Sequence, residues 1–153
     1  MNTAAFLNVL GTSLVLLTTS AVASAQPCAP VHTAVEQGLK LVQDTAVQSK
    51  QTVAYRDGPH ARLYVNCPSG KVDIAVYWAG PTPDAKFYKL VGQAGNLVSR
   101  QPATDVVKAA KQCRQQALQD DFEIASVEQG SLAIECQAYT RDGGGTSFSI
   151  FPL

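Results

Sequence analysis

The stretch that decides the fold class is residues 62–78, RLYVNCPSGKVDIAVYW. It contains two runs in which apolar and polar side chains alternate, Arg62–Cys67 and Val72–Ala79. The second run ends one residue beyond the quoted stretch. Alternation with a period of two is typical of half-buried strands, and the intervening Pro68-Ser69-Gly70 is typical of a tight turn. The stretch therefore predicts an antiparallel hairpin that presents one face to a core.

The other elements are predicted outward from this hairpin. Further strands are expected at Gln51–Arg56, Phe87–Val91, Phe122–Val127, Ser131–Ala138 and Ser147–Phe151. Helices are expected at Thr33–Gln48, which opens on a capping box, and at Thr104–Gln119, which Thr104 can cap. Short strands joined by tight turns favour an antiparallel sheet. We therefore expect an α+β, two-layer domain, with a mostly antiparallel sheet of about 6–7 strands and two helices packed on one face.

Residues 1–25 are typical of a secretory signal peptide. They carry no charged side chain, include an apolar stretch at Phe6–Val22, and end in Ala23-Ser24-Ala25, the small residues that a signal peptidase accepts. Cleavage is expected after Ala25, with Ala23 as the alternative. A membrane anchor is the competing interpretation, although Thr and Ser interrupt the run of ~20 apolar residues that a span needs. We expect residues 26–153 to be one periplasmic or extracellular domain without a membrane span.

All four cysteines follow the expected cleavage site. An even number of cysteines in a small exported domain predicts two disulfides, and four cysteines allow three connectivities. Cys136 lies on the apolar side of a strand and Cys113 on the apolar stripe of the second helix. We therefore expect Cys113–Cys136 and, by elimination, Cys28–Cys67. No CxxC pair and no histidine at ligand spacing occurs, so neither a metal site nor a cofactor is expected.

Two similar strands suggest an internal repeat. Leu63–Cys67 (LYVNC) and Leu132–Cys136 (LAIEC) stand 69 residues apart, the difference between 132 and 63. One hypothesis is the duplication of a unit made of one helix and three strands. The alternative is that buried strands resemble each other whatever their origin.

Composition excludes several classes of protein. With 12 basic and 12 acidic side chains in 153 residues, the chain has no net charge to attract nucleic acid. Its length excludes a multidomain protein or a large-cavity enzyme, and 46% hydrophobic residues exclude general disorder. Lys108, Lys111 and Arg114 are interpreted as the solvated face of the second helix.

The sequence offers no catalytic set. One of its two histidines, His60, follows Asp57 at a hairpin tip, which leaves a small hydrolase as an alternative function. No serine stands in a nucleophile elbow to complete a triad. The other histidine, His32, is four residues before Glu36, but one pair of ligands is not a metal site. Gly143-Gly144-Gly145 is interpreted as a hairpin loop, because no Lys and no helix follow it.

The face of the first hairpin opposite the core carries the candidate binding residues. They are Arg62, Tyr64, Asn66, Asp73 and Tyr77. Tyrosines among Arg, Asn and Asp are typical of recognition surfaces, although tyrosine is also an ordinary strand residue. We expect an exported, non-enzymatic binding protein that recognises a protein, cell-envelope or host component, a class that includes enzyme inhibitors. The alternatives are the hydrolase and a structural envelope protein. We expect Ser147–Phe151 to be a long uncovered edge strand, which could pair with a second copy.

Overall fold

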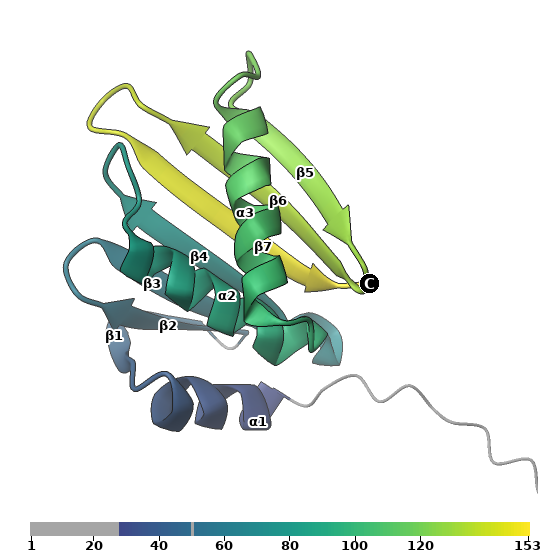
Figure 1. The fold of residues 1–153 in the computed structure, drawn as a ribbon. Coiled ribbons are helices and arrows are strands. Elements are labelled where there is room, and N and C mark those ends of the chain that lie inside the picture. The colour runs from purple at the N-terminus through teal and green to yellow at the C-terminus, as the bar shows by residue number, and fades with distance from the viewer. Residues whose placement is uncertain (1–27, 50) are drawn as a thin grey trace, which may run out of the picture.

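The computed structural model describes residues 28–49 and 51–153, so the expected signal peptide lies outside the described residues. Seven strands form one antiparallel sheet in the order β1-β2-β3-β4-β7-β6-β5 (Figure 1). The strands are β1 Val42–Gln48, β2 Thr52–Asp57, β3 Ala61–Asn66, β4 Asp73–Ala79, β5 Ile124–Gln129, β6 Leu132–Tyr139 and β7 Gly145–Pro152. The helices are α1 Cys28–Thr33, continued by a π-helical turn (η1, Ala34–Gly38), then α2 Ala85–Ser99 and α3 Ala103–Ala117, with a short 3₁₀ turn, η2, at Pro68–Gly70. The α+β class is confirmed. Within the described ranges, no helix is long and apolar enough to cross a bilayer.

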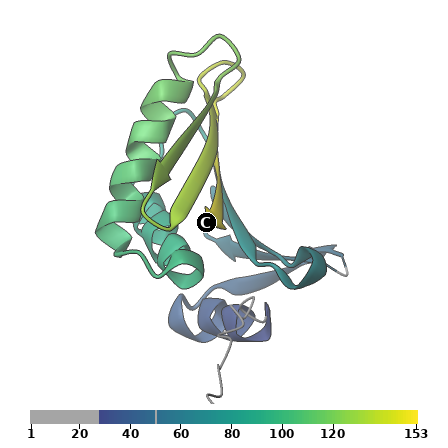
Figure 2. The same ribbon diagram turned by 90° about the vertical axis from the view of Figure 1, so that its right-hand side faces the viewer.

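The core lies between one face of the sheet and the helices that cover that face. Leu63, Val65, Ile74 and Val76 of β3 and β4 are fully buried there, together with Phe148 of β7. Helices α2 and α3 lie on the same side of the sheet (Figure 2). α2 contacts β4 and β7, α3 contacts β5 and β6, and α1 with η1 adds buried side chains to the same core.

A row of β-branched side chains crosses six strands of the sheet and relates its two halves. Through direct cross-strand pairing the row reads Val53, Val65, Ile74, Ile150, Ile134, Val127. Ile74 and Ile150 pair with each other at its centre, so β2-β3-β4 and β5-β6-β7 are arranged around an approximate twofold axis. The two strands quoted for the duplication hypothesis, β3 and β6, are the middle strands of the two halves.

Each half is joined to a helix by a disulfide. Cys28 of α1 is bonded to Cys67 after β3, and Cys113 of α3 is bonded to Cys136 of β6. This is the pairing expected from the sequence. Continuing the register of β3 and β6 places Cys67 and Cys136 at equivalent positions about the twofold axis. Two disulfides and no free cysteine among the described residues fit an oxidising compartment.

The helix predicted at Thr33–Gln48 is wrong over most of its length. The chain leaves η1 through Lys40, whose positive φ of 56° belongs to a left-handed turn, and continues as β1, paired with β2. Thr33 does not cap a helix, because its hydroxyl donates to the Ala29 carbonyl one turn earlier at 3.1 Å. The β-branched residues in Val42–Gln48 favour a strand once β2 is available as a partner.

The strand predicted at Phe87–Val91 is also wrong, because this segment belongs to α2. Asp84 caps the helix, its carboxylate accepting a hydrogen bond from the Phe87 amide at 2.7 Å. Gly92 and Gly95 lie inside the helix against α3. A Cβ on Gly92 would approach the Ala103 carbonyl oxygen to 2.7 Å, so these glycines permit close contact of the two helices.

We expect Gly95→Ala to lower the free energy of unfolding by about 1–3 kcal/mol, although alanine is the better helix former. The added methyl group would overlap the Val106 side chain and force α2 and α3 apart. Gly38→Ala is the matched control, since a Cβ at Gly38 meets nothing within 4 Å. Urea unfolding of both variants tests the expectation. Equal stability of the two variants would contradict the close helix contact.

The expectation that Ser147–Phe151 forms an edge strand is wrong. These residues belong to β7, which pairs with β4 on one side and with β6 on the other. The sheet ends instead at β1 and β5.

Candidate functional site

The five candidate binding residues lie together on the face of β3 and β4 opposite the core, which we call the open sheet face. Arg62 pairs with Tyr77, Tyr64 with Ala75, and Asn66 with Asp73 across the two strands. These five side chains and that of Ala75 are half-buried, whereas the residues between them, Leu63 and Val65 on β3 and Ile74 and Val76 on β4, are fully buried. The block predicted from the alternation is therefore one surface in three dimensions.

One end of the open sheet face carries an ion-pair cluster that the sequence did not indicate. Asp44 of β1 is only 4% exposed and accepts hydrogen bonds from Arg56 Nε at 2.6 Å and from the second Arg56 nitrogen at 2.8 Å. Arg62 Nε lies 3.6 Å from the same carboxylate. The hydrogen bonds from Arg56 hold the pKa of Asp44 below its usual value, with smaller help from Ala46 and Arg62, against the opposing effect of burial. The carboxylate thereby orients two guanidinium groups at the surface.

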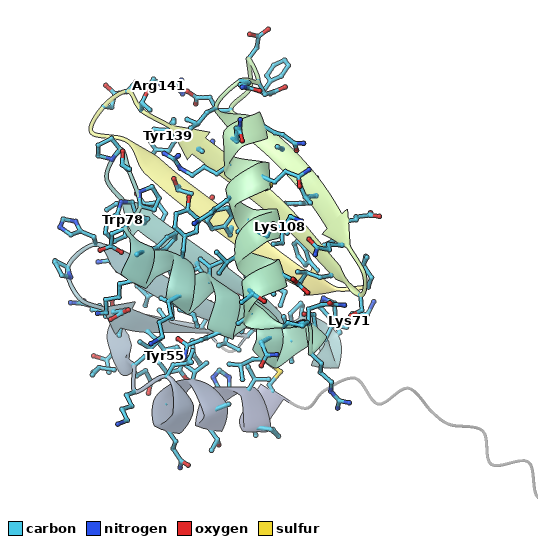
Figure 3. All side chains as sticks on the ribbon, in the orientation of Figure 1. Tyr55, Lys71, Trp78, Lys108, Tyr139 and Arg141 are labelled. Atoms are coloured by element: carbon cyan, nitrogen blue, oxygen red, sulfur yellow. A yellow bond between two sulfur atoms is a disulfide. The ribbon has the colours of Figure 1, made fainter. Side chains whose placement is uncertain are left out.

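A pair of tyrosines extends the face from β4 to β6. Hydrogen bonding to Tyr139, followed by burial, raises the pKa of Tyr77, and Arg62 is near enough to oppose this shift. Tyr139 lies opposite Gly145 of β7, and a Cβ on Gly145 would overlap the Tyr139 ring and hydroxyl. The missing side chain lets the Tyr139 ring lie across β7. The guanidinium of Arg141 stands 5.9 Å from the centre of that ring (Figure 3).

The other end of the face is a chain of neutral and acidic hydrogen-bonding groups. Thr52 donates to the Asn66 amide oxygen at 2.9 Å, and the Asn66 amide nitrogen donates to Asp73 at 2.7 Å. Between the two ends stands Tyr64, whose cross-strand neighbours are Ala54 and Ala75. Both neighbours are small, and the Tyr64 ring is half-exposed between them.

Asp57 and His60, the residues of the alternative hydrolase, line a small pocket of about 100 Å³ at the turn between β2 and β3. Asp57 forms an ion pair with Lys86 at 2.6 Å, and the His60 ring packs against Trp78 with 5.3 Å between ring centres. No hydrogen bond joins Asp57 to His60 in the described part of the chain. The carboxylate is thus committed to a lysine and does not orient the imidazole.

His32 and Glu36 are brought together by a buried tyrosine. The Tyr55 hydroxyl donates to Glu36 at 3.2 Å and accepts from His32 Nδ1 at 2.9 Å. Since both side chains are engaged by one hydroxyl, they fix α1 and η1 to β2. Among the residues described, no group of three or more His, Cys, Asp and Glu side chains could hold a metal ion.

The buried Tyr55 predicts a loss of stability in alkali. Burial, with a smaller contribution from Glu36, raises the pKa of Tyr55 to about 12 from its ordinary 10.0. Tyrosine in the unfolded chain loses its proton near pH 10, while the folded chain keeps it, so the free energy of unfolding falls between about pH 10 and pH 12. Urea unfolding across this range should show a shallower fall for Tyr55→Phe than for the wild type. Parallel curves would contradict the assignment.

Three features of the open sheet face thus define the candidate site. Tyr64 stands at its centre, guanidinium groups ordered by Asp44 lie at one end, and hydrogen-bonding groups around Asn66 lie at the other. Comparison with protein-family models, with curated proteins and with solved structures finds no match to this chain, so this surface is the basis on which its function is proposed.

Proposed function

We propose that this protein is a non-enzymatic binding protein that recognises a protein partner through the open sheet face. The supporting observation is that Tyr64, Tyr77, Tyr139 and Arg62 are half-exposed on one continuous surface. Tyrosine and arginine are the residues that most often dominate the binding energy of protein interfaces. Large, stiff side chains on a sheet lose little conformational freedom on binding, which favours affinity.

Hydrogen bonds already hold the polar groups of the face in place. Arg56 and Arg62 are directed by Asp44, and Asn66 is fixed between Thr52 and Asp73. Groups fixed before the partner arrives cost less entropy on association. The complementary partner surface would place carbonyl or carboxylate groups near Arg62 and hydrogen-bond donors near Asp73.

A binding role accounts for the surface better than the small hydrolase does. The hydrolase requires a carboxylate that orients His60, and Asp57 is paired with Lys86 instead.

We further propose that the protein is exported to the periplasm or the cell exterior. The two disulfides and the signal-like residues 1–25 support this location.

The proposal is tested by capturing the partner from native envelope and secreted fractions with two baits. One bait is the oxidised wild type and the other is Tyr64→Ala/Tyr77→Ala, both compared by quantitative mass spectrometry. We expect one protein at near-equal stoichiometry on the wild-type bait and its absence from the variant bait. Equal recovery on both baits would contradict recognition through this face, and recovery on neither would contradict the binding role.

A further inference from the structure

The helix layer carries a second candidate binding feature, a groove between α2 and α3. The two helices touch where Gly92 faces Ala103 and Gly95 faces Val106, and they diverge from that contact (Figure 1). The groove in the angle between them has a volume of about 470 Å³, within the ~300–1,000 Å³ usual for small-molecule sites. Its lining comes from the first nine residues of α2 and the first nine residues of α3.

The lining is apolar at its base and cationic at its two sides. Tyr88 and Val107, both half-buried, supply the apolar surface, while Lys89 and Lys111 are exposed on α2 and α3. Lys111 Nζ stands 5.1 Å from the centre of the Tyr88 ring, an arrangement that holds its charge beside the apolar base. No Asp or Glu lines the groove, and neither lysine forms a salt bridge within the described residues.

Charge around the groove adds to that of the two lysines. Residues 84–119 contain six basic and two acidic side chains, a net charge of +4, although the whole chain is neutral. Residues 120–153 contain six acidic side chains and one basic, a net charge of −5. The neutrality of the chain therefore conceals a separation of charge that favours anions at the helices. A neighbouring hollow between η1 and α2 also contains lysines, Lys40, Lys86 and Lys89, but unlike the groove it is lined by a carboxylate, that of Asp57, which pairs with Lys86.

We propose that the groove binds a free medium-chain fatty acid. Its carboxylate would lie between Lys89 and Lys111, and its alkyl chain would lie along Tyr88 and Val107. A neutral amphiphile would leave both lysines unused, and a small inorganic anion would leave the apolar base uncovered. An amphiphilic monocarboxylate matches both features, because its carboxylate can pair with the two lysines and its alkyl chain can cover the apolar base. This site is on the helix layer and is independent of recognition by the open sheet face.

The test uses decanoate, below its micelle concentration, titrated into the oxidised protein and followed by ¹H–¹⁵N NMR. We expect saturable shifts confined to α2, α3 and their connection, with octanoate binding several-fold more weakly because each buried methylene contributes at most about fourfold in affinity. Decanol and decyltrimethylammonium are the charge controls and should bind at least tenfold more weakly. Decanol binding as tightly as decanoate, shifts on the open sheet face, or no saturable binding would each overturn the proposal.

Matched lysine variants identify the groove itself. Lys89→Gln/Lys111→Gln should weaken decanoate binding about tenfold, since two partly solvated ion pairs are lost. Lys108→Gln is the control: like Lys111→Gln it removes one positive charge from α3, but Lys108 does not line the groove. Equal loss in the double variant and in the control, or no loss in either, would overturn the site. Unchanged decanoate binding by Tyr64→Ala/Tyr77→Ala would confirm its separation from the open sheet face, and a loss would contradict it.

Discussion

Replacing Cys113 and Cys136 together by alanine is expected to lower the free energy of unfolding by about 5 kcal/mol, the largest effect on stability that we predict. The disulfide closes a loop with a sequence separation of 23, which contributes roughly 3 kcal/mol by restricting the unfolded chain. Cys113 is fully buried and Cys136 is 3% exposed, so each lost sulfur also leaves a gap in the core that costs about 1 kcal/mol.

The second disulfide provides the comparison. Cys28–Cys67 has the longer separation, 39, so loop closure alone would rank it first, at roughly 4 kcal/mol. Both of its cysteines are only half-buried, so little is added by lost packing. We therefore expect Cys28→Ala/Cys67→Ala to be the milder double variant. Urea unfolding of the two variants decides the order, and the reverse order would show that burial of Cys113–Cys136 adds less than the difference in loop length.

Removing two rings from the open sheet face is expected to have the largest effect on function. Tyr64→Ala/Tyr77→Ala should raise the Kd for the captured partner at least 100-fold, because central interface tyrosines each contribute about 2 kcal/mol or more. Both side chains are half-exposed, so the midpoint of thermal unfolding should change by only a few degrees.

Isothermal titration calorimetry measures the Kd, and Lys108→Ala on α3 is the control that should leave it unchanged. An unchanged Kd for the tyrosine variant would remove these two residues from the interface. A rise in Kd of the same size in the Lys108 variant would place the interface on the helix layer.

Local sequence pattern accounts for six of the seven strands. In β2 to β4 and in β5 to β7 the polar and apolar side chains alternate, and turn residues such as Pro68–Gly70 separate neighbouring strands, so each hairpin can be predicted from adjacent residues. The first strand and α2 were missed because their signals depend on partners outside each segment. Val42–Gln48 becomes a strand by pairing with β2, and Gly92 is a helix contact only because α3 packs against it.

Some residues of the candidate site could likewise be predicted from local sequence and others could not. Arg62, Tyr64 and Tyr77 were predicted together because period-two alternation and one tight turn determine which side chains share a face. Asp44 was missed because its strand was expected to be a helix. Tyr139 lies over Gly145 within its own hairpin, but that hairpin joins the face only because β7 pairs with β4, a segment far away in the chain.

The most direct test of recognition through the open sheet face is photo-crosslinking from defined positions. A photoreactive phenylalanine analogue replaces Tyr64 in one protein and Lys108 in another, and each is irradiated in the native extract that holds the partner. Recognition through the open sheet face predicts one covalent adduct from position 64 and none from position 108. An adduct from position 108 alone, or none from either position while the partner is still captured, would contradict it.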